Sequence, residues 1–177
     1  KAAFQHGYEQ YGVDILQRLI DLMKKHNEDL PVAYTPEGKV DEGIPDNWGQ
    51  AAVYSALIEG LAGIVDKSTQ FRNVEISPRW MAAGKDSAEV AVRYGPTGSF
   101  IRYSYIHNPS KKTIVLEVDG DIHDGTARIL LPPSAKRGTV TVNGKSTPST
   151  TDVLNKSTYV VIKNWKGNKS KIEVSYR

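Results

Sequence analysis

The spacing of apolar residues changes once along this chain, close to Asp66, and this change constrains the fold more than any other feature of the sequence. Before it, apolar side chains recur every three or four residues, as on one face of a helix. After it, they alternate with polar side chains, as in half-buried strands. The 177 residues suffice for one domain or two small ones. We therefore predict an α+β chain, with a helical hairpin over residues 1–70 and an antiparallel β-sandwich over residues 71–177.

Two helices are expected in the first part of the chain. Residues 8–23 predict an amphipathic helix, and residues 47–65 predict a second helix that Asn47 caps. The second helix contains Gly60 and Gly63, which would permit another backbone to approach closely. It is apolar nearly all round, so it requires neighbours on most sides. The first helix cannot supply them all, so either the second half of this chain covers the helix or a further segment does.

Segments of alternating polarity predict eight strands in the second part of the chain. They cover residues 73–77, 88–94, 99–107, 113–118, 126–131, 139–142, 158–163 and 171–176. Turn-forming residues separate them, and Asn143-Gly144 is the strongest hairpin signal. Asp119-Gly120, Asp124-Gly125 and residues 166–168 predict further turns. Residues 119–125 also resemble half of a calcium loop, but they lack its glycine and its closing Glu, so a hairpin turn is favoured.

Composition excludes several classes of function. The chain has no cysteine, which excludes disulfides, zinc–thiolate sites and thiol nucleophiles. Its net charge is only +3 and no run of Lys and Arg exceeds two residues, so we expect no nucleic-acid partner. No apolar stretch approaches the ~18 residues of a membrane span, so we expect no membrane partner. Phosphate-binding loops and paired helical histidines are also lacking, and we expect neither a cofactor nor a metal.

A long polar connection over residues 27–46 contains the groups best suited to chemistry. Loops of this length inside compact domains are often functional. Breaking a glycosidic bond needs two carboxylates, and the candidate acids or bases are Glu37, Asp41, Glu42 and Asp46. Aromatic rings beside amides suit sugars, and the candidate contacts are Tyr34, Asn47, Trp48 and Gln50. The alternative is that the carboxylates are solvated loop charges and that Trp48 anchors its helix to a neighbour.

The order of these segments resembles a known enzyme family. The run Asn47-Trp48-Gly49-Gln50-Ala51-Ala52, followed by residues 57–64, is similar to the end of a six-hairpin (α/α)6-barrel glycoside hydrolase. Residues 71–80 resemble the passage by which those enzymes leave the barrel for a C-terminal β-domain. The resemblance implies that residues 1–70 are the last hairpin of such a barrel and that residues 71–177 are its accessory β-sandwich.

The resemblance also implies roles for single residues. By position, Glu37 of Pro36-Glu37-Gly38 would be the catalytic base, with Glu42 as the second candidate. In the family the partner acid lies on an earlier hairpin, so this chain alone would be inactive. We accordingly expect a carbohydrate and the upstream barrel of a parent glycoside hydrolase as partners, and a periplasmic or secreted location. The first residue, Lys1, is not Met, which leads us to expect a processed or trimmed chain or a fragment.

A second hypothesis is a non-catalytic module, either carbohydrate-binding or structural. Six aromatic side chains of the strands could form a platform for sugar: Tyr94, Tyr103, Tyr105, Tyr159, Trp165 and Tyr176. The alternative is that these side chains fill the core of the sandwich, and this interpretation is favoured for Tyr103 and Tyr105.

Overall fold

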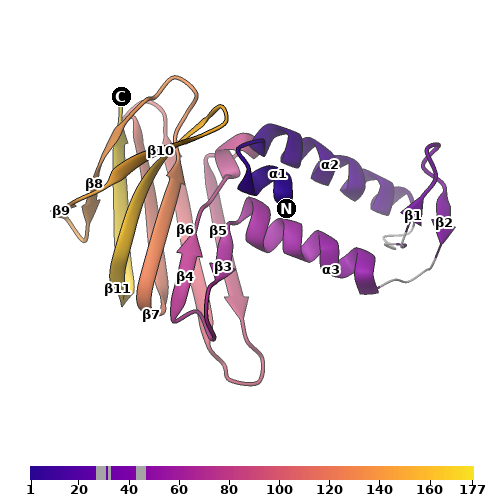
Figure 1. Ribbon diagram of the computed structural model, residues 1–177, viewed down its shortest axis with the longest axis horizontal. Helices are drawn as coiled ribbons and strands as arrows, with labels where there is room; N and C mark the ends of the chain where they lie inside the picture. The colour runs from indigo at the N-terminus through magenta and orange to yellow at the C-terminus, as the bar shows by residue number, and fades with distance from the viewer. Residues whose placement is uncertain (27–30, 32, 43–46) are drawn as a thin grey trace.

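The computed structural model describes residues 1–26, 31, 33–42 and 47–177 of the chain. A helical part and a large folded sheet lie side by side along the longest axis of the molecule (Figure 1). The predicted α+β class is confirmed. None of the described helices combines the length with the apolar character that a membrane crossing demands.

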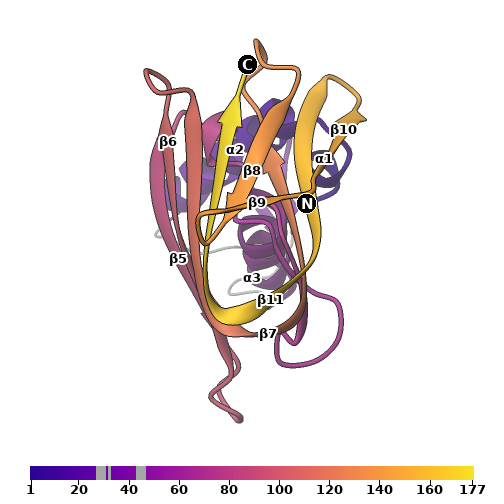
Figure 2. The same ribbon diagram turned by 90° about the vertical axis from the view of Figure 1, so that its left-hand side faces the viewer.

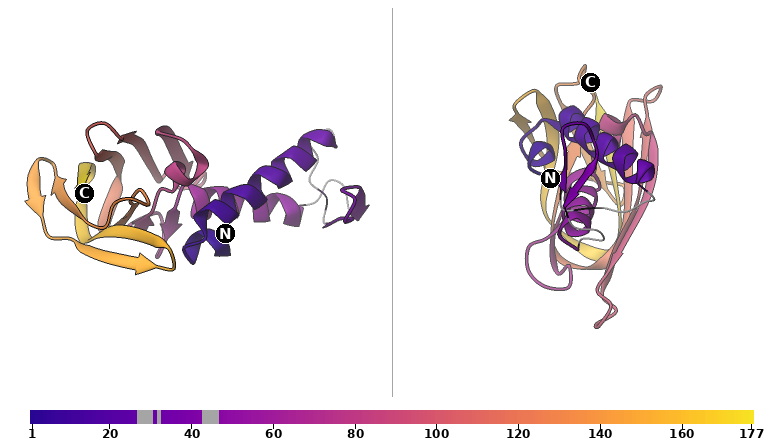
Figure 3. Two further views of the ribbon diagram at one scale, coloured as in Figure 1. Left: turned by 90° about the horizontal axis from the view of Figure 1, so that it is seen from above. Right: turned by 90° about the vertical axis from the view of Figure 1, so that its right-hand side faces the viewer.

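The helical part is an antiparallel hairpin. It starts with α1 (Ala2–Gln5) and α2 (Glu9–Lys25) and returns through α3 (Asn47–Ser55), which continues into the π-helical segment η1 (Ala56–Leu61). A small ribbon of β1 (Ala33–Tyr34) and β2 (Val40–Glu42) lies at the end of the hairpin far from the sheet (Figures 1 and 3). The second helix ends at residue 61 rather than at residue 65, because Gly63 adopts a φ of +70° and turns the chain into the sheet.

Phe4 lies at the centre of the helical part and is almost completely buried. Its ring packs against Gly12 of α2 and Gly60 of η1, where an added Cβ would lie 3.0 Å and 2.6 Å from the ring. The other buried members of this cluster are Leu16, Val53 and Leu61. The close approach expected at Gly60 therefore comes from an aromatic side chain, whereas the backbone of Ser77 makes the close approach at Gly63.

The sheet contains nine strands. They are β3 (Ile64–Asp66), β4 (Asn73–Ile76), β5 (Ser87–Arg93), β6 (Phe100–Asn108), β7 (Thr113–Leu130), β8 (Gly138–Val142), β9 (Lys145–Thr147), β10 (Thr150–Leu154) and β11 (Ser157–Tyr176). A short 3-10 helix, η2 (Trp80–Ala83), lies between β4 and β5. Among the described strands only β4 and β7 pair in parallel, so the sheet is mixed rather than fully antiparallel.

The two longest strands, β7 and β11, bend midway and so take part in both layers of a sandwich (Figure 2). In one layer the strand order is β5-β6-β7-β11-β8-β9, with the first half of β7 and the second half of β11. In the other layer the order is β3-β4-β7-β11-β10, with the remaining halves. The large apolar core fills the space between the layers.

The prediction of turns at three places that lie within β7 and β11 is wrong. Asp119-Gly120 and Asp124-Gly125 lie within β7, and residues 166–168 lie within β11. The strands bend there without ending: the N–H groups of His123 and Asp124 both donate to the carbonyl oxygen of Arg72 at 2.9 Å. The register of β11 on β7 likewise shifts between residues 162 and 169. Irregularities of this kind increase bending while the ladder continues on both sides.

The Asn143-Gly144 hairpin is confirmed. It joins β8 to β9, with Val142 opposite Lys145 and both turn residues at positive φ. Of the sheet strands, β3, β9 and β10 were not predicted. The first two residues of β3 fall in the span predicted as the second helix, and the residues of β9 and β10 do not alternate in polarity.

A buried polar network fixes the helical part on the sheet. The carboxylate of Glu9, at the start of α2, accepts a hydrogen bond from the Tyr159 hydroxyl of β11. The buried guanidinium of Arg79 donates from Nη1 to the carbonyl oxygens of Gly60 and Ser77, at 2.6 and 3.0 Å. Because unpaired polar groups are costly when buried, these bonds favour one orientation of the hairpin against the sheet.

Buried tyrosines should make this fold sensitive to alkali. Burial raises the pKa of Tyr159 to about 12, and it also raises the pKa values of Tyr103 and Tyr105. A tyrosine in the unfolded chain has a pKa of about 10. The stabilisation is therefore complete below about pH 10 and is lost as the pH rises through the folded-state values. In that range the free energy of unfolding should fall by about 1.4 kcal/mol per pH unit for each of the three tyrosines.

Denaturant unfolding followed by circular dichroism across this pH range measures the effect. In Tyr159→Phe the free energy of unfolding should fall less steeply with pH, by about 1.4 kcal/mol per pH unit, which is the contribution of one tyrosine. A slope that stays the same in this variant would contradict the assignment to Tyr159.

Candidate functional site

The β1–β2 ribbon is tied to the end of α2. His26, which follows α2, has its Nε2 2.8 Å from the carbonyl oxygen of Gly38, and its ring centroid lies 5.6 Å from that of Tyr34. Tyr34 pairs with Val40 across the ribbon, and the turn is closed by a bond of 2.8 Å from the Gly38 N–H to the Thr35 carbonyl oxygen. The ribbon therefore holds a defined position relative to the helix.

Glu37 lies at the exposed tip of this ribbon. Hydrogen bonds from the Thr35 side chain and from its own backbone N–H lower the pKa of Glu37. A carboxylate with a lowered pKa is ionised at neutral pH, so it can accept a proton or attack a carbon but is a poor proton donor.

Two further predicted site residues, Asp41 and Glu42, lie on β2 of this ribbon. The remaining ones follow the ribbon along the chain and are Asp46, Asn47, Trp48 and Gln50. Asp46 lies outside the described residues, as do the side chains of Glu42 and Asn47. The ribbon and the start of α3 share one end of the molecule (Figure 1), so Tyr34, Glu37 and Trp48 belong to segments at that end. In the described part of the chain, no three His, Asp or Glu side chains gather as a metal ion would require.

Several large apolar side chains of the helical part remain in water. Trp48 is 79% exposed, so no neighbour among the described residues of this chain covers it. Tyr54 on α3 is 61% exposed, and Tyr8, Tyr11 and Ile15 are exposed at the three- and four-residue spacing of one helix face. The sheet therefore leaves part of the hairpin uncovered. We call Tyr8, Tyr11, Ile15 and Tyr54 the uncovered helical residues.

The hypothesis that six aromatic side chains of the sheet form a platform for sugar is wrong. Five of the six aromatic side chains are buried: Tyr103, Tyr105, Tyr159, Trp165 and Tyr176. Tyr94 alone of the six is exposed, and its hydroxyl donates to Asp66 Oδ2 at 2.9 Å. The core-filling interpretation is thus confirmed for Tyr103 and Tyr105, because alternate side chains of a strand that faces a second layer must point into the core.

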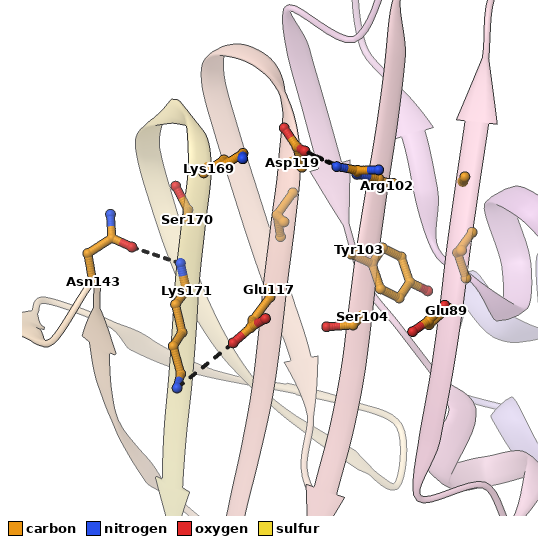
Figure 4. Close-up of a pocket in the computed structure, with 13 residues that line it drawn as sticks. Glu89, Arg102, Tyr103, Ser104, Glu117, Asp119, Asn143, Lys169, Ser170 and Lys171 are labelled. Carbon is orange, nitrogen blue, oxygen red and sulfur yellow. Dashed lines mark hydrogen bonds and ion pairs between the residues drawn. The ribbon is translucent and has the colours of Figure 1, made fainter.

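A hollow of about 790 Å³ on the outer face of the sheet was not predicted (Figure 4). Its lining comes from β5, β6, β7, β11 and the β8–β9 turn, which lie far apart in the sequence. The sequence contains one signal for this hollow: charged and small residues occupy the outward-facing positions of the alternating strands. That signal does not say which strands are neighbours, so the hollow could not be assembled from it.

Comparisons with known proteins give partial similarities. No family model and no curated protein matches the sequence. An α-L-rhamnosidase from Dictyoglumus thermophilum aligns over 92% of this chain and 20% of its own, with a TM-score of 0.49 and 9% identity. A glycoside hydrolase aligns over 60% and 16%, with a TM-score of 0.44 and 9% identity. A β-L-arabinofuranosidase of family GH127 from Geobacillus stearothermophilus T6 aligns over 73% and 18%, with a TM-score of 0.41 and 13% identity.

These neighbours are glycoside hydrolases. The chain spans a fifth or less of the length of each.

Proposed function

We propose that this chain is the C-terminal part of a glycoside hydrolase, with its helical part as the last hairpin of an (α/α)6 barrel and its sheet as an accessory β-sandwich. The observation that carries the proposal is the exposure of the uncovered helical residues. Large apolar side chains repeated on a helix face mark a surface that another segment covers. Further barrel helices, supplied upstream in the parent chain, would cover this one.

In this proposal Glu37 is the catalytic base and Glu42 is the second candidate. The ionised Glu37 would take a proton from a water molecule that attacks the anomeric carbon. By the family resemblance the general acid would come from an earlier hairpin, and an inverting pair of carboxyl groups would stand roughly 6.5–9.5 Å apart across the glycosidic bond. Half of the catalytic pair is then outside this chain, which would be inactive alone.

The substrate contacts in this proposal come from the ribbon and the first turn of α3. The exposed Trp48 offers a ring for the apolar face of a sugar, and Tyr34 lies on the neighbouring ribbon. The amides of Asn47 and Gln50 would bond hydroxyl groups. A glycosidase that acts on external saccharides belongs in the periplasm or outside the cell, and we extend the proposal to that location.

A comparison of this chain with the longer protein tests the proposal. Both are assayed on a panel of chromogenic glycosides, and both are titrated with a dye that fluoresces on exposed apolar surface. We expect hydrolysis by the longer protein only, and dye binding by the isolated chain that falls when the upstream helices are present. Hydrolysis by the isolated chain, or a longer protein that hydrolyses nothing, would contradict it.

The second candidate function is a carbohydrate-binding module without catalysis. The specific observation in its favour is the hollow on the sheet. Because this hollow is built from the sheet alone, it could bind a sugar whether or not the helical part belongs to a hydrolase.

A further inference from the structure

Two rows of side chains cross the hollow on the outer face of the sheet (Figure 4). The strand register places Ala91, Arg102, Asp119 and Lys169 in the first row. It places Glu89, Ser104, Glu117 and Lys171 in the second row. Asn143, from the β8–β9 turn, extends the second row beyond Lys171. Nine side chains from five segments thus face one space.

Short side chains form the floor of this space. Ser104 lies between Glu89 and Glu117 in the second row, and Ala91 ends the first row beside Arg102. A small side chain next to long ones leaves room above it. The resulting volume, about 790 Å³, is within the range of ligand sites, which is roughly 300–1,000 Å³. The lining combines charged and amide side chains with apolar surface, so the ligand that fits this space carries both polar groups and apolar faces.

The polar groups are held in place by bonds among themselves. Arg102 donates from Nε and Nη2 to Asp119 Oδ2, at 3.0 and 2.7 Å, and its guanidinium lies 5.8 Å from the centre of the Phe100 ring. Asn143 Oδ1 accepts a bond of 2.8 Å from the N–H of Lys171, which leaves the amide NH2 of Asn143 as an oriented donor. Groups that are ordered before a ligand arrives lose less entropy when it binds.

The charges of the hollow balance. The cations Arg102, Lys169 and Lys171 equal in number the carboxylates Glu89, Glu117 and Asp119. A polyanion or a polycation would meet as many like charges as opposite ones, so neither is favoured. A sugar hydroxyl both donates and accepts hydrogen bonds, and it fits beside a cation and a carboxylate at once.

We propose that this hollow binds a neutral oligosaccharide. The sugar hydroxyls would bond the two rows, and the partly exposed ring of Phe100, next to Arg102 on the same face of β6, would contact an apolar sugar face. This inference rests on the second candidate function and names the ligand class of its site. The site lies on the sheet and shares no residue with the β1–β2 ribbon, so it does not depend on Glu37 or on the hydrolase proposal.

Titration with short neutral oligosaccharides tests the site. The intact chain is titrated with oligosaccharides of glucose, xylose, mannose, galactose, arabinose and rhamnose, followed by calorimetry and by amide chemical shifts. We expect saturable binding of at least one, with the largest shifts in β6, β7 and β11. Binding to none of them, or binding only to the acidic polygalacturonate included for comparison, would overturn the proposal.

Two substitutions on one strand separate a role in binding from a role in folding. Ser104→Phe fills the hollow and removes no charge, so it should weaken binding by about tenfold or more. Ile106→Phe lies two residues further along the same outward face of β6, outside the lining, and should leave binding unchanged. Lys171→Gln removes a side chain of the second row and should also weaken binding. Unfolding curves establish that each variant is folded.

The proposal is wrong if Ser104→Phe and Lys171→Gln both bind as the unsubstituted chain does. It is also wrong if the face instead joins two copies of the chain, which sedimentation would detect as self-association that Ser104→Phe abolishes without any glycan binding. The titration measures sugar binding by the sheet and not hydrolysis. A negative result would therefore leave the hydrolase proposal unaffected, and failure of the hydrolase proposal would leave this one unaffected.

Discussion

Glu37→Gln should lower kcat of the parent hydrolase by about a thousandfold and leave KM nearly unchanged. Gln keeps the size and the hydrogen-bonding shape of the side chain but cannot take a proton from water. Hydrogen bonds from Thr35 and from the backbone lower the pKa of Glu37, so the base is already ionised in the free enzyme. Initial rates over a range of substrate concentrations separate the two constants, and an unchanged KM would show that substrate binding survives.

Two neighbours on the ribbon serve as controls for this substitution. Asp41→Asn removes an exposed carboxylate from β2 and should leave kcat near its normal value. Glu42→Gln tests the second candidate, which ends the same strand. Near-normal turnover in Glu37→Gln would eliminate Glu37, and a loss confined to Glu42→Gln would assign the base to Glu42.

Gly63→Ala should reduce the free energy of unfolding by about 4 kcal/mol, a large part of the roughly 5–15 kcal/mol of a typical domain. Gly63 has a φ of +70°, where a residue with a Cβ is strained by about 1–2 kcal/mol. The added Cβ would also lie 1.8 Å from the carbonyl oxygen of Ser77 and 2.3 Å from its carbon. The contact is with backbone atoms, which cannot rotate away as a flexible side chain could. The Ser77 N–H also donates to the Gly63 carbonyl oxygen at 2.8 Å. The two segments therefore cannot separate without breaking the start of the β3–β4 pair.

Gly84→Ala provides the matched control. Gly84 has a φ of +67°, but an added Cβ would meet no atom within 4 Å. This variant should therefore lose only the conformational part, about 1 kcal/mol. Denaturant unfolding of both variants gives the difference in free energy of unfolding, which measures the close approach of the Ser77 backbone to Gly63. Equal losses in the two variants would contradict a rigid contact at that place.

The family resemblance pointed to the segment before the second helix, but only the structure shows how Glu37 and its neighbours are arranged there. The order of segments indicated a loop with Glu37 before the second helix, and the structure places that residue at the tip of the β1–β2 ribbon, at the same end of the molecule as the start of α3 (Figure 1). The same sequence could not tell that Trp48 stays in water, because the spacing of apolar residues is the same whether or not a neighbour is present.

The aromatic residues of the strands show a second limit. Alternation placed Tyr103 and Tyr105 on one face of a strand, but alternation does not say whether that face meets water or a second layer. The bends of β7 and β11 decide this, since they bring a second layer of the same sheet over these rings. Asp119-Gly120 is a turn signal in isolation, yet pairing with β6 and β11 on both sides keeps the strand continuous through it.

The sequence by itself determined the class of this protein. Hydrophobic period is a local property, so the change near Asp66 was enough to predict helices followed by strands, and Asn143-Gly144 was enough to predict one hairpin. Only the tertiary structure decided which strands are neighbours. Arg102 faces Asp119, and Ser104 faces Glu117, through hydrogen-bonded register between segments that no local pattern connects, and the hollow on the sheet exists because of that register.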